Sequence, residues 1–235
     1  MRGRVEALGV PWRELSGTSG SLKLHPVQTP LALAEMSRAA LAVRAVAHRV
    51  SADLIHANSV RAGLTAGGAR SLGGPPVLTH VHDHLAPGAM TTVLGAALRA
   101  GSAGYLSISG WAESGLHGRP VHRIGNPVDI ERFAPGGDRI DLPAGPHLGV
   151  LAQITPWKGQ LEAVSALAVV RERHPEARLL LVGEVKFAEA GTRYDNRTYL
   201  RELHAHIAGL GLGDAVEFLG EREDAPDILR SLDVL

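Results

Sequence analysis

The segment Leu148–Gly159, with the sequence LGVLAQITPWKG, places a lysine where it could bind a phosphate. An apolar strand leads into a turn at Pro156, and Lys158 then stands at the expected start of a helix. Ligands of open α/β sheets bind beyond the carboxyl ends of the strands, where the free N–H groups of helix N-termini favour anions. A charge pair at about 4 Å contributes up to about 4 kcal/mol at an effective dielectric constant of about 20. The segment therefore predicts a phosphate site, and the alternative is a solvated lysine in a first helical turn.

Histidines recur at every second residue in the first half of the chain, at His80, His82 and His84. A continuous strand would place them on one face, so together they could ligate zinc or another divalent ion. Such a strand holds the side chains about 7 Å apart along the row, which is too far for a compact site. We therefore expect no metal here, and a hydrogen-bonded structural histidine remains an alternative for each of them.

The elements that must position these residues alternate as in βαβ units, which predicts an α/β fold with doubly wound parallel sheets. In the first half, strands are expected at residues 53–57, 77–82 and 105–109, with helices at 29–50 and 63–72. Residues 1–11 read as the tail of a helix running into a strand. In the second half, strands are expected at residues 148–152, 178–182 and 215–219, with helices at 157–173, 195–210 and 224–232. Prolines and glycines crowd residues 126–147, which suits a connection between two domains.

The composition excludes several classes of protein. The 235 residues hold 24 basic and 24 acidic side chains, and this balance argues against a nucleic-acid partner, which needs a basic face. Cysteine is absent, so a disulfide framework, a thiolate metal site and a cysteine nucleophile are all excluded. No apolar stretch approaches the roughly 20 residues of a membrane span, and no signal peptide is evident. We therefore expect a soluble, cytoplasmic protein.

Several short blocks follow one another in the order found in a known family. They are DLIHANS at residues 53–59, HVHD at 80–83, NPVDIERF at 126–133, LAQITPWKG at 151–159, LLLVGE at 179–184 and FLGEREDAPDILRSLDVL at 218–235. On these blocks the chain resembles the retaining glycosyltransferases of the GT-B fold, specifically family 4, the glycosyl transferases group 1. The resemblance implies two Rossmann-like domains, both incomplete: an acceptor-side domain at residues 1–133, a linker at 134–147 and a nucleotide-sugar-binding domain at 148–235.

The resemblance also implies an activity, the transfer of a hexose from a nucleotide diphosphate sugar to an acceptor with retention of the anomeric configuration. Lys158 would stabilise the charge that develops on the departing diphosphate, and His82 would bond to the donor sugar or the acceptor. Gln153 stands where the family usually has an arginine, and offers a neutral hydrogen-bond donor in place of a charge. The residues expected at the donor are Gln153, Lys158, Gly159, Gly183, Glu184, Leu219, Gly220 and Glu221, and Asn126 is expected between the domains.

The expected partners are a nucleotide sugar and an acceptor that is a polysaccharide, a lipid or a small molecule, with no cofactor and no metal. A lipid acceptor would bring the protein to a membrane surface as a peripheral protein. The family's paired glutamates (E-x7-E) and its glycine-rich first turn are both missing, so the chain reads as truncated at both ends. An alternative is therefore a non-catalytic remnant that binds nucleotide weakly or pairs with another subunit. A nucleotide-sugar epimerase of the same architecture fits the blocks less well.

Overall fold

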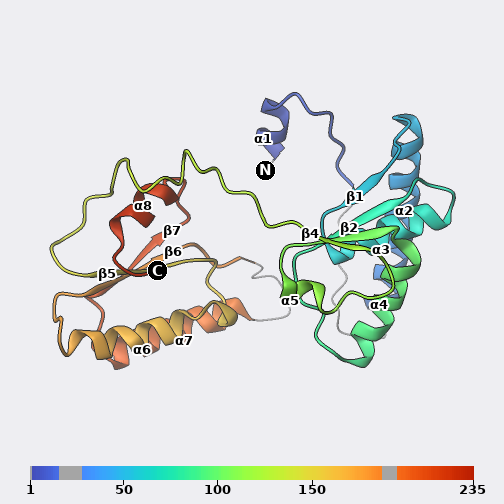
Figure 1. The fold of residues 1–235 in the computed structure, drawn as a ribbon. Helices are drawn as coiled ribbons and strands as arrows, with labels where there is room; N and C mark the ends of the chain where they lie inside the picture. Colours follow the sequence, from blue (N-terminus) through green and yellow to red (C-terminus); the bar gives the residue numbers. More distant parts are fainter. Residues whose placement is uncertain (1, 16–27, 187–194) are drawn as a thin grey trace. The chain divides into compact units, whose positions relative to one another are not determined.

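The computed structural model describes residues 2–15, 28–186 and 195–235 (Figure 1). The chain divides into two compact units, Met1–Pro127 and Val128–Leu235. The described residues of each unit form one parallel β-sheet, with four strands in the first unit and three in the second. Among the described residues, no helix is both long enough and apolar enough to cross a lipid bilayer.

In the first unit the strands follow the order β1-β2-β3-β4, and all neighbours are parallel. The strands are β1 (Ile55–Ala57), β2 (Val77–Val81), β3 (Gly104–Ser107) and β4 (Val121–Arg123). The helices are α1 (Arg2–Ala7), α2 (Gln28–Arg49), α3 (Val60–Ser71), α4 (Ala89–Gly101) and α5 (Gly110–Glu113). The three predicted strands and the two predicted helices are confirmed, whereas the strand expected within residues 1–11 is wrong, because α1 is followed by irregular chain over residues 8–15.

Small residues bring α3 close to its neighbours in this unit. A Cβ added at Gly63 would lie 2.4 Å from Cγ2 of Thr79 in β2, and one at Gly67 would lie 2.8 Å from the Cα of Gly101 in α4. The hydroxyl of Thr79 is fully buried, and it forms a 2.7 Å hydrogen bond with the buried hydroxyl of Ser102. The glycines thus let the helix backbones approach one another and the sheet directly.

The second unit is built around the central strand of a β5-β6-β7 sheet. Its elements are β5 (His147–Leu151), the short 3-10 helix η1 (Pro156–Lys158), α6 (Gln160–Arg171), β6 (Arg178–Val182), α7 (Asn196–Gly209), β7 (Val216–Gly220) and α8 (Ala225–Ser231). The strands and helices predicted here are confirmed, apart from the start of α6 described below. Val234 adds an isolated parallel bridge to Leu148 of β5.

Side chains of β6 alternate between two apolar layers, as expected for a strand buried on both faces. Leu179 and Leu181 pack into the cluster formed with α6 and α7, whereas Leu180 and Val182 pack with Ile228 of α8. Accordingly, α6 and α7 cover one face of the sheet and α8 the other (Figure 1). Because the three strands are parallel, their carboxyl ends lie at one edge of the sheet, and the candidate site lies at this edge.

Candidate functional site

A pocket of about 450 Å³ opens at the carboxyl ends of β5, β6 and β7. Its walls are the last residues of β5 and β6, the turns that follow these two strands, and the loop between β7 and α8. The lining residues are Leu151, Ala152, Gln153, Lys158, Val182, Gly183, Glu184, Lys186, Glu221, Arg222 and Ala225. The pocket therefore occupies the place where parallel α/β sheets bind their ligands.

Lys158 reaches the pocket from the 3-10 helix η1, which begins with a proline at Pro156. The prediction of one continuous helix from Trp157 is wrong at its start, because Gly159 adopts the left-handed conformation (φ 75°) and separates η1 from α6. Glycine adopts this conformation without steric cost. Lys158 thus lies in a turn ahead of α6, with its side chain exposed at the pocket.

The turn after β6 lies directly against the turn after β5, and Gly183 makes this contact possible. Its φ is +137°, and a Cβ at this position would lie 2.1 Å from the carbonyl oxygen of Ala152. Two hydrogen bonds join the turns here, from Ala152 N to Val182 O (2.9 Å) and from Ile154 N to Glu184 O (3.0 Å). The sheet ladder therefore continues into the pocket wall and holds Gln153 beside Glu184.

Two of the three cationic side chains at the pocket are paired with carboxylates. Lys186 forms a 2.6 Å ion pair with Glu221. Arg222 bonds to both carboxylate oxygens of Asp224, from Nε (2.8 Å) and Nη2 (2.5 Å), and these hydrogen bonds hold the pKa of Asp224 below its ordinary value. By contrast, the ammonium of Lys158 has no acidic partner among the described residues. An incoming anion could bind Lys158 without breaking an ion pair of this part of the chain.

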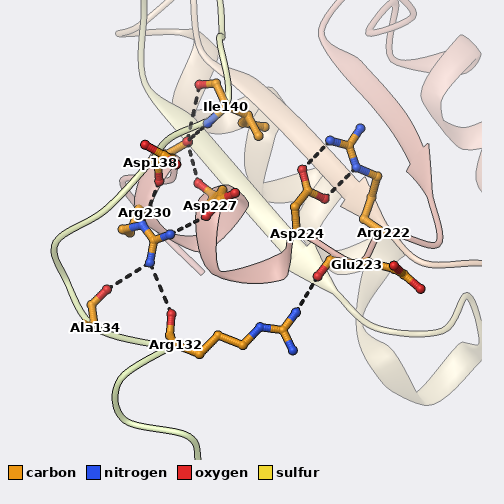
Figure 2. Close-up of polar contacts among 10 residues, drawn as sticks. Arg132, Ala134, Asp138, Ile140, Arg222, Glu223, Asp224, Asp227 and Arg230 are labelled. Carbon is orange, nitrogen blue, oxygen red and sulfur yellow. Dashed lines mark hydrogen bonds and ion pairs between the residues drawn. The ribbon is translucent and has the colours of Figure 1, made fainter. Parts of the chain in front are cut away.

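The loop that carries Glu221 and Arg222 is held from outside the pocket (Figure 2). Arg132 Nη2 donates a 2.6 Å hydrogen bond to the carbonyl of Glu223. The nearly buried Arg230 of α8 donates to the carbonyls of Arg132, Ala134 and Asp138, over 3.4, 3.1 and 2.7 Å, and pairs with Asp227. Residues 132–140 thereby form a strap over α8, and the same segment fixes the third wall of the pocket.

The structure brings together five of the residues predicted at the donor, since Gln153, Lys158, Gly183, Glu184 and Glu221 all line the pocket. Gly159 caps α6 beside Lys158, and Gly220 ends β7 with a positive φ of 67°. Leu219 packs instead against the apolar layer that contains Leu180 and Ile228.

Sequence reasoning missed the charged pocket residues Lys186 and Arg222, together with the apolar residues Leu151, Ala152, Val182 and Ala225. The available signal was the alternation of charges in GEREDAP (220–226), together with a lysine three residues after the glycine of LLLVGE. Neither pattern shows by itself that Lys186 meets Glu221, because 35 residues separate the two in the sequence.

His82 lies in the first unit, one residue beyond the end of β2, where its Nε2 is 2.8 Å from Oδ1 of Asn58. The expected single row of histidines does not form, because β2 ends at Val81. The His80 ring stacks on that of His56 and is tilted against that of His82, and its pKa is lowered by burial and then by these two neighbours. His84 stacks instead on Trp111, with ring centroids 4.5 Å apart.

Across residues 2–15, 28–186 and 195–235, no group of three or more His, Asp or Glu side chains is placed to hold a metal ion. Asn126 is exposed, next to the last residue of the first unit.

Comparisons with known proteins find similarity in family and in fold. The family described as glycosyl transferases group 1 matches residues 144–235. HepE of Anabaena, solved with UDP and glucose, matches with a TM-score of 0.72 and 23% identity over 99% of this chain and 62% of HepE. HepE solved with UDP-glucose matches with a TM-score of 0.68 and 25% identity over 83% of this chain and 55% of HepE.

Sucrose-phosphate synthase of Thermosynechococcus elongatus matches with a TM-score of 0.66 and 19% identity over 88% of this chain and 54% of the synthase. None of the curated protein sequences compared matches the chain. The chain thus spans between about half and two thirds of the length of these solved glycosyltransferases. The expected fold class, α/β with two parallel-sheet units of the GT-B type, is confirmed. Over residues 144–235, which lie in the second unit, the chain is similar to the glycosyl transferases group 1 family.

Proposed function

We propose that this protein transfers a hexose from a nucleotide diphosphate sugar to an acceptor, with retention of the anomeric configuration. The observation that carries the proposal is Lys158, a cation without an acidic partner in the described part of the chain, at the pocket of the family-matching unit. HepE was solved in complex with UDP and glucose and with UDP-glucose, and these ligands make a uridine diphosphate sugar the first donor to test.

The chemistry of the pocket suits a diphosphate and a sugar. Departure of the leaving group places negative charge on the diphosphate, and a cation already positioned there stabilises the transition state. Lys158 supplies this charge, and the amide of Gln153 adds a neutral donor to a phosphate oxygen. The carboxylates of Glu184 and Glu221 accept hydrogen bonds from hydroxyl groups of the ribose or of the donor sugar. The proposal includes no metal and no cofactor, and it places the reaction in the cytoplasm.

In the first unit, His82 is the residue proposed to bond to the donor sugar or the acceptor. Its ring is oriented by the 2.8 Å hydrogen bond to Asn58, which leaves Nδ1 for a substrate hydroxyl. Because Oδ1 of Asn58 can only accept, Nε2 carries the proton, and Nδ1 of the neutral ring can accept a hydrogen bond from a substrate hydroxyl.

The experiment is a calorimetric titration of UDP and UDP-glucose into the protein and into two lysine variants. Lys158→Ala removes a charged hydrogen bond to phosphate worth about 1.5–3 kcal/mol, so the affinity falls by roughly 10- to 150-fold. Lys186→Ala is the matched control, since that lysine lines the same pocket but is already neutralised by Glu221. Equal losses in the two variants would contradict the role of Lys158.

Transfer itself is tested by UDP release from UDP-glucose and by the anomer of the first sugar product. Retention predicts an α-linked product from the α-linked donor, read by NMR. A second candidate function, a non-catalytic nucleotide-binding protein, is favoured by the neutral Gln153 in the pocket wall. Binding of UDP without any consumption of UDP-glucose would support that second function.

A further inference from the structure

Polar side chains lie beneath the pocket at positions where apolar packing would be expected. Gln160, Asn196 and Tyr199 are only 1%, 2% and 4% exposed, at the beginnings of α6 and α7. Burying such groups costs free energy unless their hydrogen bonds are made. The groups to which they bond therefore indicate what this layer does.

Gln160 and Tyr199 connect α7 with the turn that carries Gln153. Gln160 Nε2 donates a 3.0 Å hydrogen bond to the carbonyl of Gln153. The hydroxyl of Tyr199 donates to Oε1 of Gln160 (3.3 Å) and accepts from the amide of Leu161 (3.4 Å). A side chain of α7 thus acts through α6 on the backbone of a pocket residue.

Asn196 connects the first turn of α7 with the turn after β6, which carries Lys186. Its Nδ2 donates a 2.7 Å hydrogen bond to the carbonyl of Lys186. Residues three apart lie on the same face of a helix. Asn196 and Tyr199 therefore bond from one face of α7, Asn196 to the turn that carries Lys186 and Tyr199 to Gln160, which holds the turn that carries Gln153. Asp195 caps this turn through hydrogen bonds to the amide (3.0 Å) and hydroxyl (2.6 Å) of Thr198, which fixes the start of the helix.

We propose that Asn196 and Tyr199 on the first turn of α7 are positioning residues, which set the spacing of the Gln153–Lys158 turn and the Lys186 turn. Asn196 acts directly on Lys186 O, and Tyr199 acts on Gln153 O by way of Gln160. The inference rests on the proposed function, because it assigns these turns to the binding of a nucleoside diphosphate. Neither side chain lines the pocket, so both act through the backbone that they hold.

The first test is a double-mutant cycle on UDP affinity with Tyr199→Phe and Lys158→Ala. Tyr199→Phe removes only the hydroxyl, and it should weaken UDP binding by roughly 2- to 10-fold, the equivalent of one net hydrogen bond. Lys158→Ala should then cost less in the Phe background than in the wild-type protein, because the lysine is already misplaced. Unchanged affinity in Tyr199→Phe, or strictly additive losses, would overturn the proposal.

A matched control separates positioning from stability. Leu203 is fully buried one turn further along α7 and has no part in the polar layer, so Leu203→Ala lowers the thermal stability of the unit. Its UDP affinity, measured where the variant is still folded, should stay at the wild-type value. A loss of affinity in Leu203→Ala equal to that in Tyr199→Phe would refute a specific role of the hydroxyl.

The second test needs no ligand and therefore separates this inference from the proposed function. The amide of Ile154 donates to the carbonyl of Glu184 and that of Lys158 to the carbonyl of Thr155, so their hydrogen exchange reports the order of the turn. Exchange over residues 152–161 should accelerate in Tyr199→Phe and in Gln160→Met, but not in Leu203→Ala. Unchanged exchange in both polar variants would overturn the positioning role, whereas a wild-type protein that binds no UDP would overturn the proposed function alone.

Discussion

Replacing Gly183 by alanine tests the close contact between the turns after β5 and β6. The added methyl group would lie 2.1 Å from the carbonyl oxygen of Ala152, and the backbone at this position has a φ of +137°. Since the contact is with backbone, no side-chain rotation can relieve it. The two pocket walls must therefore separate, or the peptide must leave its present conformation.

The cost follows from the groups that are disturbed. A non-glycine residue in this region of conformational space costs about 1–3 kcal/mol. Separation of the turns weakens the bonds from Ala152 N to Val182 O and from Ile154 N to Glu184 O, worth about 0.5–1.5 kcal/mol each. The total is about 2–6 kcal/mol, against a stability of about 5–15 kcal/mol for a typical domain. The variant should therefore fold but melt at least about 8 °C lower.

Thermal unfolding followed by circular dichroism measures this loss, and UDP titration of the folded variant measures the damage to the pocket. Gly213→Ala is the control in the same unit, because a Cβ there meets nothing within 4 Å. It should leave both the melting temperature and the UDP affinity close to the wild-type values. If Gly183→Ala unfolded within about 1 kcal/mol of the wild-type protein, the steric argument for this glycine would be refuted.

Three further predictions concern contacts elsewhere in the two units. Arg230→Met keeps the apolar stem but removes the donors to the strap, and urea denaturation should show a loss of about 2–4 kcal/mol. Because hydrogen bonds from Arg222 lower the pKa of Asp224, this pair stabilises the folded loop above the ordinary carboxylate pKa, and the contribution disappears as the pH falls through the lowered value. A titration of the Asp224 carboxyl carbon by NMR should show the lowered midpoint, which should return toward normal in Arg222→Gln. Thr79→Val leaves the buried Ser102 hydroxyl without its partner and should cost about 1–3 kcal/mol in thermal unfolding, whereas full stability would argue against the buried hydrogen bond.

Strands with buried side chains are predictable from the sequence, because they form apolar runs. A strand that is held mainly by hydrogen bonds to a neighbouring strand has no such pattern and is missed. Residues 178–182 form β6 as expected, because an apolar run of this kind is stable only between two covering layers. The strand β4 was not predicted, since Val121–Arg123 is short and polar and is held mainly by its register with Tyr105–Ser107. Such pairing depends on tertiary contacts that no local pattern records.

The candidate site shows the same division. The position of a lysine at the pocket after β5 was predictable from the apolar strand, Pro156 and Gly159, because these residue types determine where the strand ends and the turn begins. The sequence did not predict the left-handed conformation of Gly159 or the ion pair of Lys186 with Glu221, because both depend on the folded backbone. The contact from Tyr199 to Gln160 joins residues 39 positions apart, and it could not be read from either helix alone.

The way in which Arg230 holds the strap has a consequence for sequence variation. Its guanidinium bonds to the carbonyls of Arg132, Ala134 and Asp138, a group that every amino acid carries. Side chains at these three positions can therefore be exchanged without detaching the segment from the helix. Gly137 is the exception, because its φ is +130° and an added methyl group would lie 3.0 Å from the guanidinium carbon. Ala134 and Asp138 should accordingly tolerate many substitutions, whereas Gly137 should tolerate few and Arg132 is constrained by its own side-chain hydrogen bond to the carbonyl of Glu223.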